Sequence, residues 1–353
     1  AWGERVDSEP PDTSVVVRYR LNEAQPRVIW GRVGWRSESG VGGEAHWQHR
    51  NFYGGARTLT LSSNFESGWG ALEATNTRTV GLSALVRQPY LIQRTMAGTF
   101  GPFVRFRDDF RDRSLLYGLE TSVIYRVRPL ETVTAQHEVS RLRVDDTYQL
   151  TPLSEVIAQG DSVFAPIFVK SIFRLRGAYG TLDDRINPTS GYLVEPSIEV
   201  TGPSGISDVE FFRMSVQGMA ARRLTPGLTL YMRGTAGRLF PFGESDPESG
   251  VSRTRAIVGL RDVMFTAGGT NDVRGWANGL MGSKIPDVGV DEDGVVVADR
   301  FVPAGGLVRL TGTAELGMPF PLLSDPHRTY VFFDAGRVRS PGAPFEPGHP
   351  GLP

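Results

Sequence analysis

Long stretches of the chain alternate strictly between apolar and polar side chains. Within residues 308–316, Val308, Leu310 and Ala314 share one parity, whereas Arg309 and Glu315 share the other. The same alternation recurs in three further segments: 79–87, 115–128 and 212–223. Period-two alternation indicates β-strands, and a run of about ten residues is the length that a tilted strand needs to cross a bilayer.

The pattern predicts an all-β protein, and specifically a transmembrane antiparallel β-barrel. Charged residues on the polar face suit a wide, wet lumen with a lipid-facing exterior. A soluble β-sandwich is the alternative, but its strands average about five to six residues. The connections also favour a membrane barrel, because they are short at one set of strand ends, as at 128–130, and long and polar at the other, as at 147–166 and 243–304. The predicted strands are 28–36, 42–51, 57–64, 79–88, 96–107, 115–128, 132–143, 167–179, 193–201, 210–223, 228–240, 307–318 and 329–338.

These strands number thirteen, whereas bacterial barrels normally close with an even number. Segment 341–353 cannot supply another strand, because its repeated prolines remove ladder donors. We therefore expect a barrel of about sixteen strands in the full protein, lacking its last strands in this chain. The long loop at 243–304 is expected to insert into the lumen.

Composition removes several other classes. The formal net charge is −1, which argues against a nucleic-acid partner, and the absence of Cys excludes disulfide scaffolds and thiolate metal sites. The chain contains no run of about eighteen apolar residues, so the sequence predicts no membrane-spanning helix. His46 and His49 lie three apart and would face opposite sides of a strand, so we predict no metal site. No catalytic constellation and no cofactor motif stand out, and we expect a protein that is not an enzyme.

The long polar stretch contains a glycine-rich motif around one arginine, Phe265-Thr-Ala-Gly268-Gly269-Thr-Asn-Asp-Val273-Arg274-Gly275-Trp276. It resembles the Gly-Gly and Val-Arg-Gly-aromatic signature in the sixth extracellular loop of the BamA/TamA outer-membrane assembly and transport superfamily. Four other segments resemble the same family in the same order: 49–55, 184–192, 314–320 and 331–338. The resemblance covers about Pro26 to Val338 and implies an integral protein of the bacterial outer membrane.

Arg274 is the leading candidate for a structural lock. A loop tucked into the lumen would bring its guanidinium towards inward carboxylates, and Glu315 and Asp334 occupy polar-parity positions of adjacent predicted strands. Taken alone, the residues leave a bland alternative open, in which Arg274 is a solvated loop charge and both carboxylates line a wet channel. The family resemblance implies the pairing of the loop arginine with both acids.

The N-terminal residues differ in kind from the rest. Segment 14–21 reads as one short strand followed by a linker, and it resembles the closing strand of a periplasmic POTRA domain. We therefore expect residues 1–25 to be the remnant of the last POTRA domain and 26–353 to be the barrel domain. A free N-terminal tail is the alternative for the first segment.

Three functions are compatible with these features. The resemblance favours an assembly factor that inserts other outer-membrane proteins through a labile seam, where Gly31 and Gly34 would weaken the first strand. A polypeptide-secretion pore of the two-partner type and a passive channel are the alternatives. The expected partners are outer-membrane lipid and lipopolysaccharide, unfolded outer-membrane proteins, and periplasmic accessory proteins docked through POTRA domains. Aromatic residues of the first hairpin are expected as interfacial anchors: Trp30, Trp35, Trp47 and Tyr53.

Overall fold

One antiparallel sheet of thirteen strands dominates the computed structural model of the chain. The structure describes residues 3–5, 17–19, 25–37, 39–71, 77–109, 112–147, 167–202, 205–246, 253–270, 272–282, 284–290, 296–303, 305–319 and 328–339. The sheet strands are β3 (Arg27–Arg36), β4 (Gly40–His49), β5 (Thr58–Glu66), β6 (Arg78–Pro89), β7 (Met96–Asp108), β8 (Asp112–Arg128), β9 (Glu131–Thr147), β10 (Ile167–Gly180), β11 (Ser190–Thr201), β12 (Phe211–Thr225), β13 (Leu228–Pro241), β16 (Val308–Pro319) and β17 (Arg328–Arg339).

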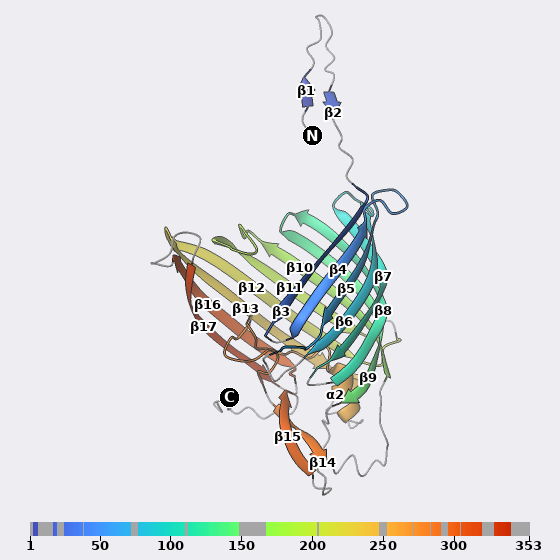
Figure 1. Cartoon of the computed structure of the whole chain (residues 1–353), viewed down its shortest axis with the longest axis vertical. Coiled ribbons are helices and arrows are strands. Elements are labelled where there is room, and N and C mark those ends of the chain that lie inside the picture. The colour runs from blue at the N-terminus through green and yellow to red at the C-terminus, as the bar shows by residue number, and fades with distance from the viewer. Residues whose placement is uncertain are drawn as a thin grey trace, which may run out of the picture.

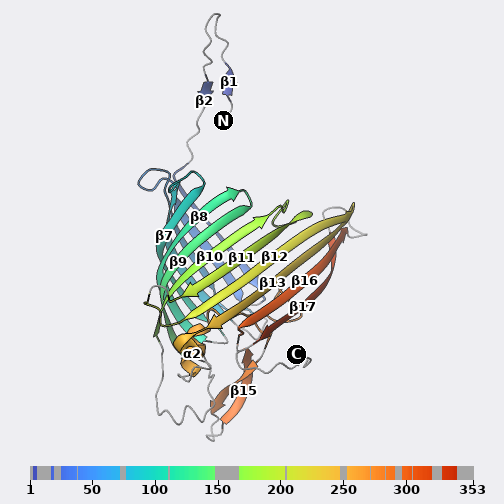
Figure 2. The same cartoon turned by 180° about the vertical axis from the view of Figure 1, so that it is seen from behind.

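Each strand pairs with its neighbours in chain order, apart from the step from β13 to β16. The long, tilted strands wrap around a common interior, so that β3 and β4 lie in front of β10 and β11 in Figure 1, while β8 to β13 form the near wall in Figure 2. Among the described strands, β3 and β17 each have a single neighbour and form the two edges of the sheet. All thirteen predicted strands are confirmed, and the total of about sixteen for the full protein stays a prediction.

The two faces of the sheet differ as the alternation predicts. On β16 and β17 the outer face carries Leu310, which is 61% exposed, and Phe333, which is 71% exposed, while Glu315 and Asp334 lie on the inner face. Such large exposed apolar side chains suit contact with lipid. Within the described part of the chain, no helix is long and apolar enough to span a membrane.

The segment between β13 and β16 contains more regular structure than a polar loop. It forms a short 3₁₀ helix, η1 (Gly243–Ser245), then α2 (Arg253–Leu260), and then a hairpin of β14 (Lys284–Val290) and β15 (Val296–Pro303). Its central part packs on the inner face of the sheet and buries Val258, Leu260 and Phe265 against strand residues such as Phe168 and Leu239. The predicted insertion of this loop into the lumen is therefore confirmed.

The N-terminal part differs from the prediction at Trp30 and contains one additional strand pair. Trp30 does not lie on the outer face with the other aromatic residues of the first hairpin: its ring stacks on His46, with centroids 4.0 Å apart, on the face that carries the Arg32–Glu44 pair. Trp30 was expected as an interfacial anchor, but the alternation of β3 places it on the inner face together with Arg32, away from lipid. Before the sheet, β1 (Gly3–Arg5) pairs antiparallel with β2 (Val17–Tyr19).

Candidate lumen lock and strand edge

The glycine-rich motif folds into a compact turn that presents Arg274 to the sheet. Gly268 and Gly269 have φ values of 110° and 101°, a left-handed region that side chains rarely adopt. A Cβ at Gly268 would also overlap the carbonyl oxygen of Ala277. The Gly269 N–H donates to the carbonyl of Trp276 at 2.8 Å, which closes the turn. The two glycines are therefore required by backbone geometry.

Arg274 contacts both predicted carboxylates. Its Nε and Nη2 donate to the two carboxylate oxygens of Asp334, each at 2.8 Å, and its backbone N–H donates to the same group at 3.0 Å. Nη2 also lies 2.8 Å from Glu315 Oε1. The guanidinium stacks on the ring of Phe332, 3.5 Å from its centroid. The hydrogen bond with Asp334 raises the pKa of Arg274 above its ordinary value, so the lock keeps its positive charge.

The sheet register explains why the two acids meet one arginine. Asp334 of β17 faces Thr313 of β16, and Glu315 lies two residues further along β16 on the same face. The side chain of Asp334 is 6% exposed and that of Glu315 is 24% exposed. A forked donor between two such carboxylates is a strong and orientation-specific contact.

The other motif residues contribute unequally. Val273 is buried with Ala267, Met281 and Val338, and Trp276 packs against this cluster. Gly336 of β17, which sequence reasoning missed, leaves room for the loop, because a Cβ there would lie 3.0 Å from Val273. A Cβ at Gly275 would meet nothing within 4 Å, so packing does not explain this glycine.

A second anchor of the loop was not predicted. Lys170 of β10 is fully buried, and its Nζ donates to the carbonyl of Gly259 at 2.7 Å and pairs with Asp262. A further ion pair joins Arg309 of β16 to Asp272 at 3.0 Å. A lone lysine in an alternating strand looks like a solvated lumen residue, and only the folded loop gives it a partner.

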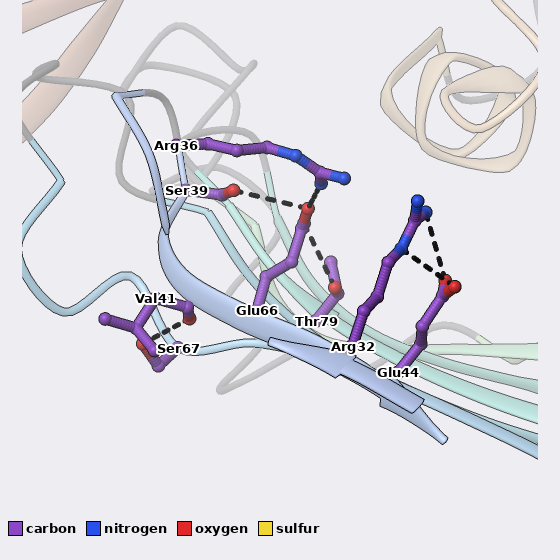
Figure 3. A network of polar contacts seen from close by, with 8 residues as sticks. All are labelled: Arg32, Arg36, Ser39, Val41, Glu44, Glu66, Ser67 and Thr79. Carbon is purple, nitrogen blue, oxygen red and sulfur yellow. Dashed lines mark hydrogen bonds and ion pairs between the residues drawn. The ribbon is translucent and has the colours of Figure 1, made fainter. Parts of the chain in front are cut away.

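The edge strand β3 is exposed along almost its whole length. It pairs with β4 in continuous register from Arg27 to Arg36. Inner-face ion pairs tie it to the sheet: Arg32 to Glu44 at 2.8 Å and Arg36 to Glu66 of β5 at 2.7 Å, as Figure 3 shows. Ser39 and Thr79 donate to Glu66 as well.

The two predicted seam glycines sit in different environments. A Cβ at Gly34 would meet nothing within 4 Å, whereas a Cβ at Gly31 would lie 2.8 Å from the carbonyl oxygen of Glu44. Gly31 is therefore required by the close approach of β4. Gly34 lies opposite Gly42, so this part of the inner face carries no side chain on either strand.

A lipid-facing antiparallel sheet with a long loop fixed on its inner face defines an outer-membrane barrel protein. The model of the Omp85 superfamily domain matches residues 45–349, and the chain belongs to this superfamily. The predicted family resemblance is thus confirmed, and membership makes the chain an integral protein of the bacterial outer membrane. Proteins of the Omp85 superfamily, as a family, insert or transport proteins at that membrane and are not enzymes.

A solved structure supports the fold. The chain resembles the crystal structure of BamA from Haemophilus ducreyi lacking POTRA domains 1–3, with a TM-score of 0.73 and 19% sequence identity. The match covers 96% of this chain and 62% of that one, so the chain spans less than two thirds of its length. A search of curated proteins gave no match.

Proposed function

We propose that this chain is the barrel of an assembly factor that inserts other outer-membrane proteins through a labile seam at β3. The observation that carries the proposal is the weak side-chain attachment of β3 to β4, on a strand that is exposed along almost its whole length. A strand edge presents unpaired N–H and C=O groups that can pair with an incoming strand. No covalent chemistry is required, because backbone pairing itself guides the substrate.

Weak attachment of β3 supports this role. The Arg32 and Arg36 side chains are 70% and 65% exposed, and ion pairs at such exposure contribute about 0–1 kcal/mol each. Gly31 and Gly34 add little side-chain packing to the edge. Among the described contacts of β3, the ladder with β4 is therefore the main one.

Under this proposal the Arg274 lock keeps the long loop in the lumen while the seam works. The partners Glu315 and Asp334 lie on β16 and β17, at the opposite edge of the sheet from β3. The lock would thus keep the loop attached at the β16–β17 edge of the sheet while the β3 edge receives a substrate strand.

We further propose that residues 1–25 belong to the last periplasmic POTRA domain. The pairing of β1 with β2 supports this assignment, because it makes the short strand at Val17–Tyr19 part of a sheet. Accessory proteins would dock through such domains and not through the barrel.

The proposal is tested by photo-cross-linking in the host. A photoreactive residue replaces Val33 on β3 of the full protein, and a matched control replaces Leu119 on β8, since both side chains face outwards and are exposed. We expect adducts with several nascent outer-membrane proteins at Val33 and none at Leu119. Equal adducts at both positions would contradict a seam at β3.

The alternatives predict different outcomes. A polypeptide-secretion pore would cross-link a single secreted protein, from lumen positions such as Gln217, and depletion would abolish that protein alone. A passive channel would conduct ions in planar bilayers while its depletion changes no outer-membrane protein. An assembly factor should lower many such proteins on depletion.

A further inference from the structure

Arginine gathers on the outer face of the sheet at one end of the strands. Pairing across the sheet fixes the outer parity, which contains the exposed residues Leu310, Phe333 and Tyr117. Near one end of the strands these outer positions carry seven exposed arginines: Arg78, Arg113, Arg141, Arg143, Arg238, Arg337 and Arg339. We call this set the arginine rim.

The rim lies at the cell-surface end of the sheet. The long connections 148–166 and 242–307 join strands at this end, whereas the two-residue turns after β8 and β12 lie at the other. Long loops mark the extracellular side of outer-membrane barrels and short turns the periplasmic side. The rim therefore borders the outer leaflet of the membrane.

The charge of the two ends is unequal. Among outward strand residues whose side chains the structure describes, the one acid at the rim end is Asp108, which pairs with Arg113 at 3.4 Å. The periplasmic end instead carries tyrosines such as Tyr125 and Tyr179, with Arg27 and Arg222 as outward arginines. Among the described outward side chains, positive charge is therefore concentrated at the rim end.

Arg141 and Arg143 show what the rim can bind. They lie two residues apart on the same face of β9, about 7 Å along the strand. Tyr117 and Val169 flank Arg141 on the neighbouring strands, and Leu115 and Ile167 flank Arg143. Two guanidinium forks at the border of an apolar surface suit a phosphate group whose attached acyl chains lie on that surface.

We propose that the arginine rim, centred on Arg141 and Arg143, binds the phosphate groups of a phosphorylated lipid of the outer leaflet. The charge excess selects an anion, and the apolar side chains beside each arginine select a lipid over a soluble anion. Lipid bound there would fix the depth of β8 to β10 in the membrane. This assignment needs the outer-membrane location but not the proposed assembly function.

The experiment uses the full protein in detergent, with bisphosphorylated lipid A as the probe and native mass spectrometry as the readout. The variants are Arg141→Gln, Arg141→Gln with Arg143→Gln, and Arg141→Lys. The matched control is Arg222→Gln, which removes an outward arginine at the periplasmic end. Heat-modifiable gel mobility verifies that each variant folds, and Arg141→Gln alone decides the question if the double variant does not fold.

We expect the double variant to lose roughly tenfold in lipid affinity, because two exposed ion pairs with the phosphate groups disappear. Arg141→Lys should keep part of the binding, and Arg222→Gln all of it. Equal binding by the wild type and the double variant would overturn the proposal, as would equal retention of dephosphorylated lipid A. Displacement of the lipid by millimolar inorganic phosphate would also overturn it, since the rim would then bind a free anion.

Discussion

Replacing Arg274 by Ala should free the central part of the long loop from the lumen wall. The change removes the fork on Asp334, the contact with Glu315 and the stacking on Phe332. Breaking a buried ion pair by removing one partner costs about 3–5 kcal/mol. Arg274 is 23% exposed and Asp334 is 6% exposed, so the low end of that range, about 3 kcal/mol, applies.

A loss of about 3 kcal/mol raises the population of the released loop roughly 150-fold. Hydrogen exchange measures that population at the backbone amide of residue 274, which donates to Asp334 of β17, and at the amides of Gly269 and Met281, whose bonds lie within the loop. Arg274→Lys should give a smaller increase, because it keeps the charge but loses the fork. Arg185→Ala, which removes an exposed turn arginine 3.9 Å from Glu195, serves as the control. Unchanged exchange in Arg274→Ala would refute the lock.

Three further predictions concern the other anchors and turns. Lys170→Ala should release α2 at a cost of about 3 kcal/mol, because Asp262 and the Gly259 carbonyl lose their buried partner. Tryptic cleavage at Arg253 and Arg255 should then accelerate, and unchanged cleavage would contradict the role of Lys170 as an anchor. Gly34→Ala should leave the free energy of unfolding unchanged or raise it by about 0.5–1 kcal/mol, whereas Gly31→Ala should lower it by about 1–3 kcal/mol. Equal effects of the two variants in thermal unfolding would show that the close approach of the Glu44 carbonyl to Gly31 does not limit the side chain there. In the turn after β10, hydrogen bonds from Thr189 and Ser190 lower the pKa of Asp183 below its ordinary value of about 4. The stability that the Asp183 carboxylate gives the turn is therefore present above about pH 4 and is lost only as the pH falls through the lowered pKa. Amide exchange of Ser190 should stay slow at about pH 4 in the wild type and become fast at that pH in Asp183→Asn.

The strands could be predicted because the bilayer imposes one simple pattern on them. The run at 228–240 matches β13 (Leu228–Pro241) closely, since most of its outward residues are apolar, as lipid requires, and most of its inward residues are polar or small. The end of β9 was missed: the prediction stopped at residue 143, but the strand continues to Thr147. Beyond the apolar band the pattern is lost, and pairing with β8 alone extends the strand.

The contents of the long loop could not be predicted in the same way. Helix α2 is eight residues long, and an isolated helix of that length is unstable in water. It persists because Val258 and Leu260 are buried against strand residues such as Phe168, which lie about 90 positions earlier in the chain. The triad of Arg274, Glu315 and Asp334 was easier to predict, because strand parity placed both carboxylates on the inner face and the family resemblance of the loop motif implied their pairing with the arginine.

The magnitudes of these contacts indicate which part of the sheet yields first. The loop anchors named above are a fully buried lysine on β10 and an arginine fork on β17, each worth about 3 kcal/mol. The side-chain pins of β3 are two exposed arginine pairs, the Trp30–His46 stack and the hydrogen bond from Trp35 Nε1 to the Gly70 carbonyl, each worth about 1 kcal/mol. None of the named loop anchors lies on β3 or β4, so separation of these two strands breaks the ladder and the weak pins but leaves the loop seated. A force or a competing strand that acts on the sheet should therefore open the β3 edge before it releases the lumen loop.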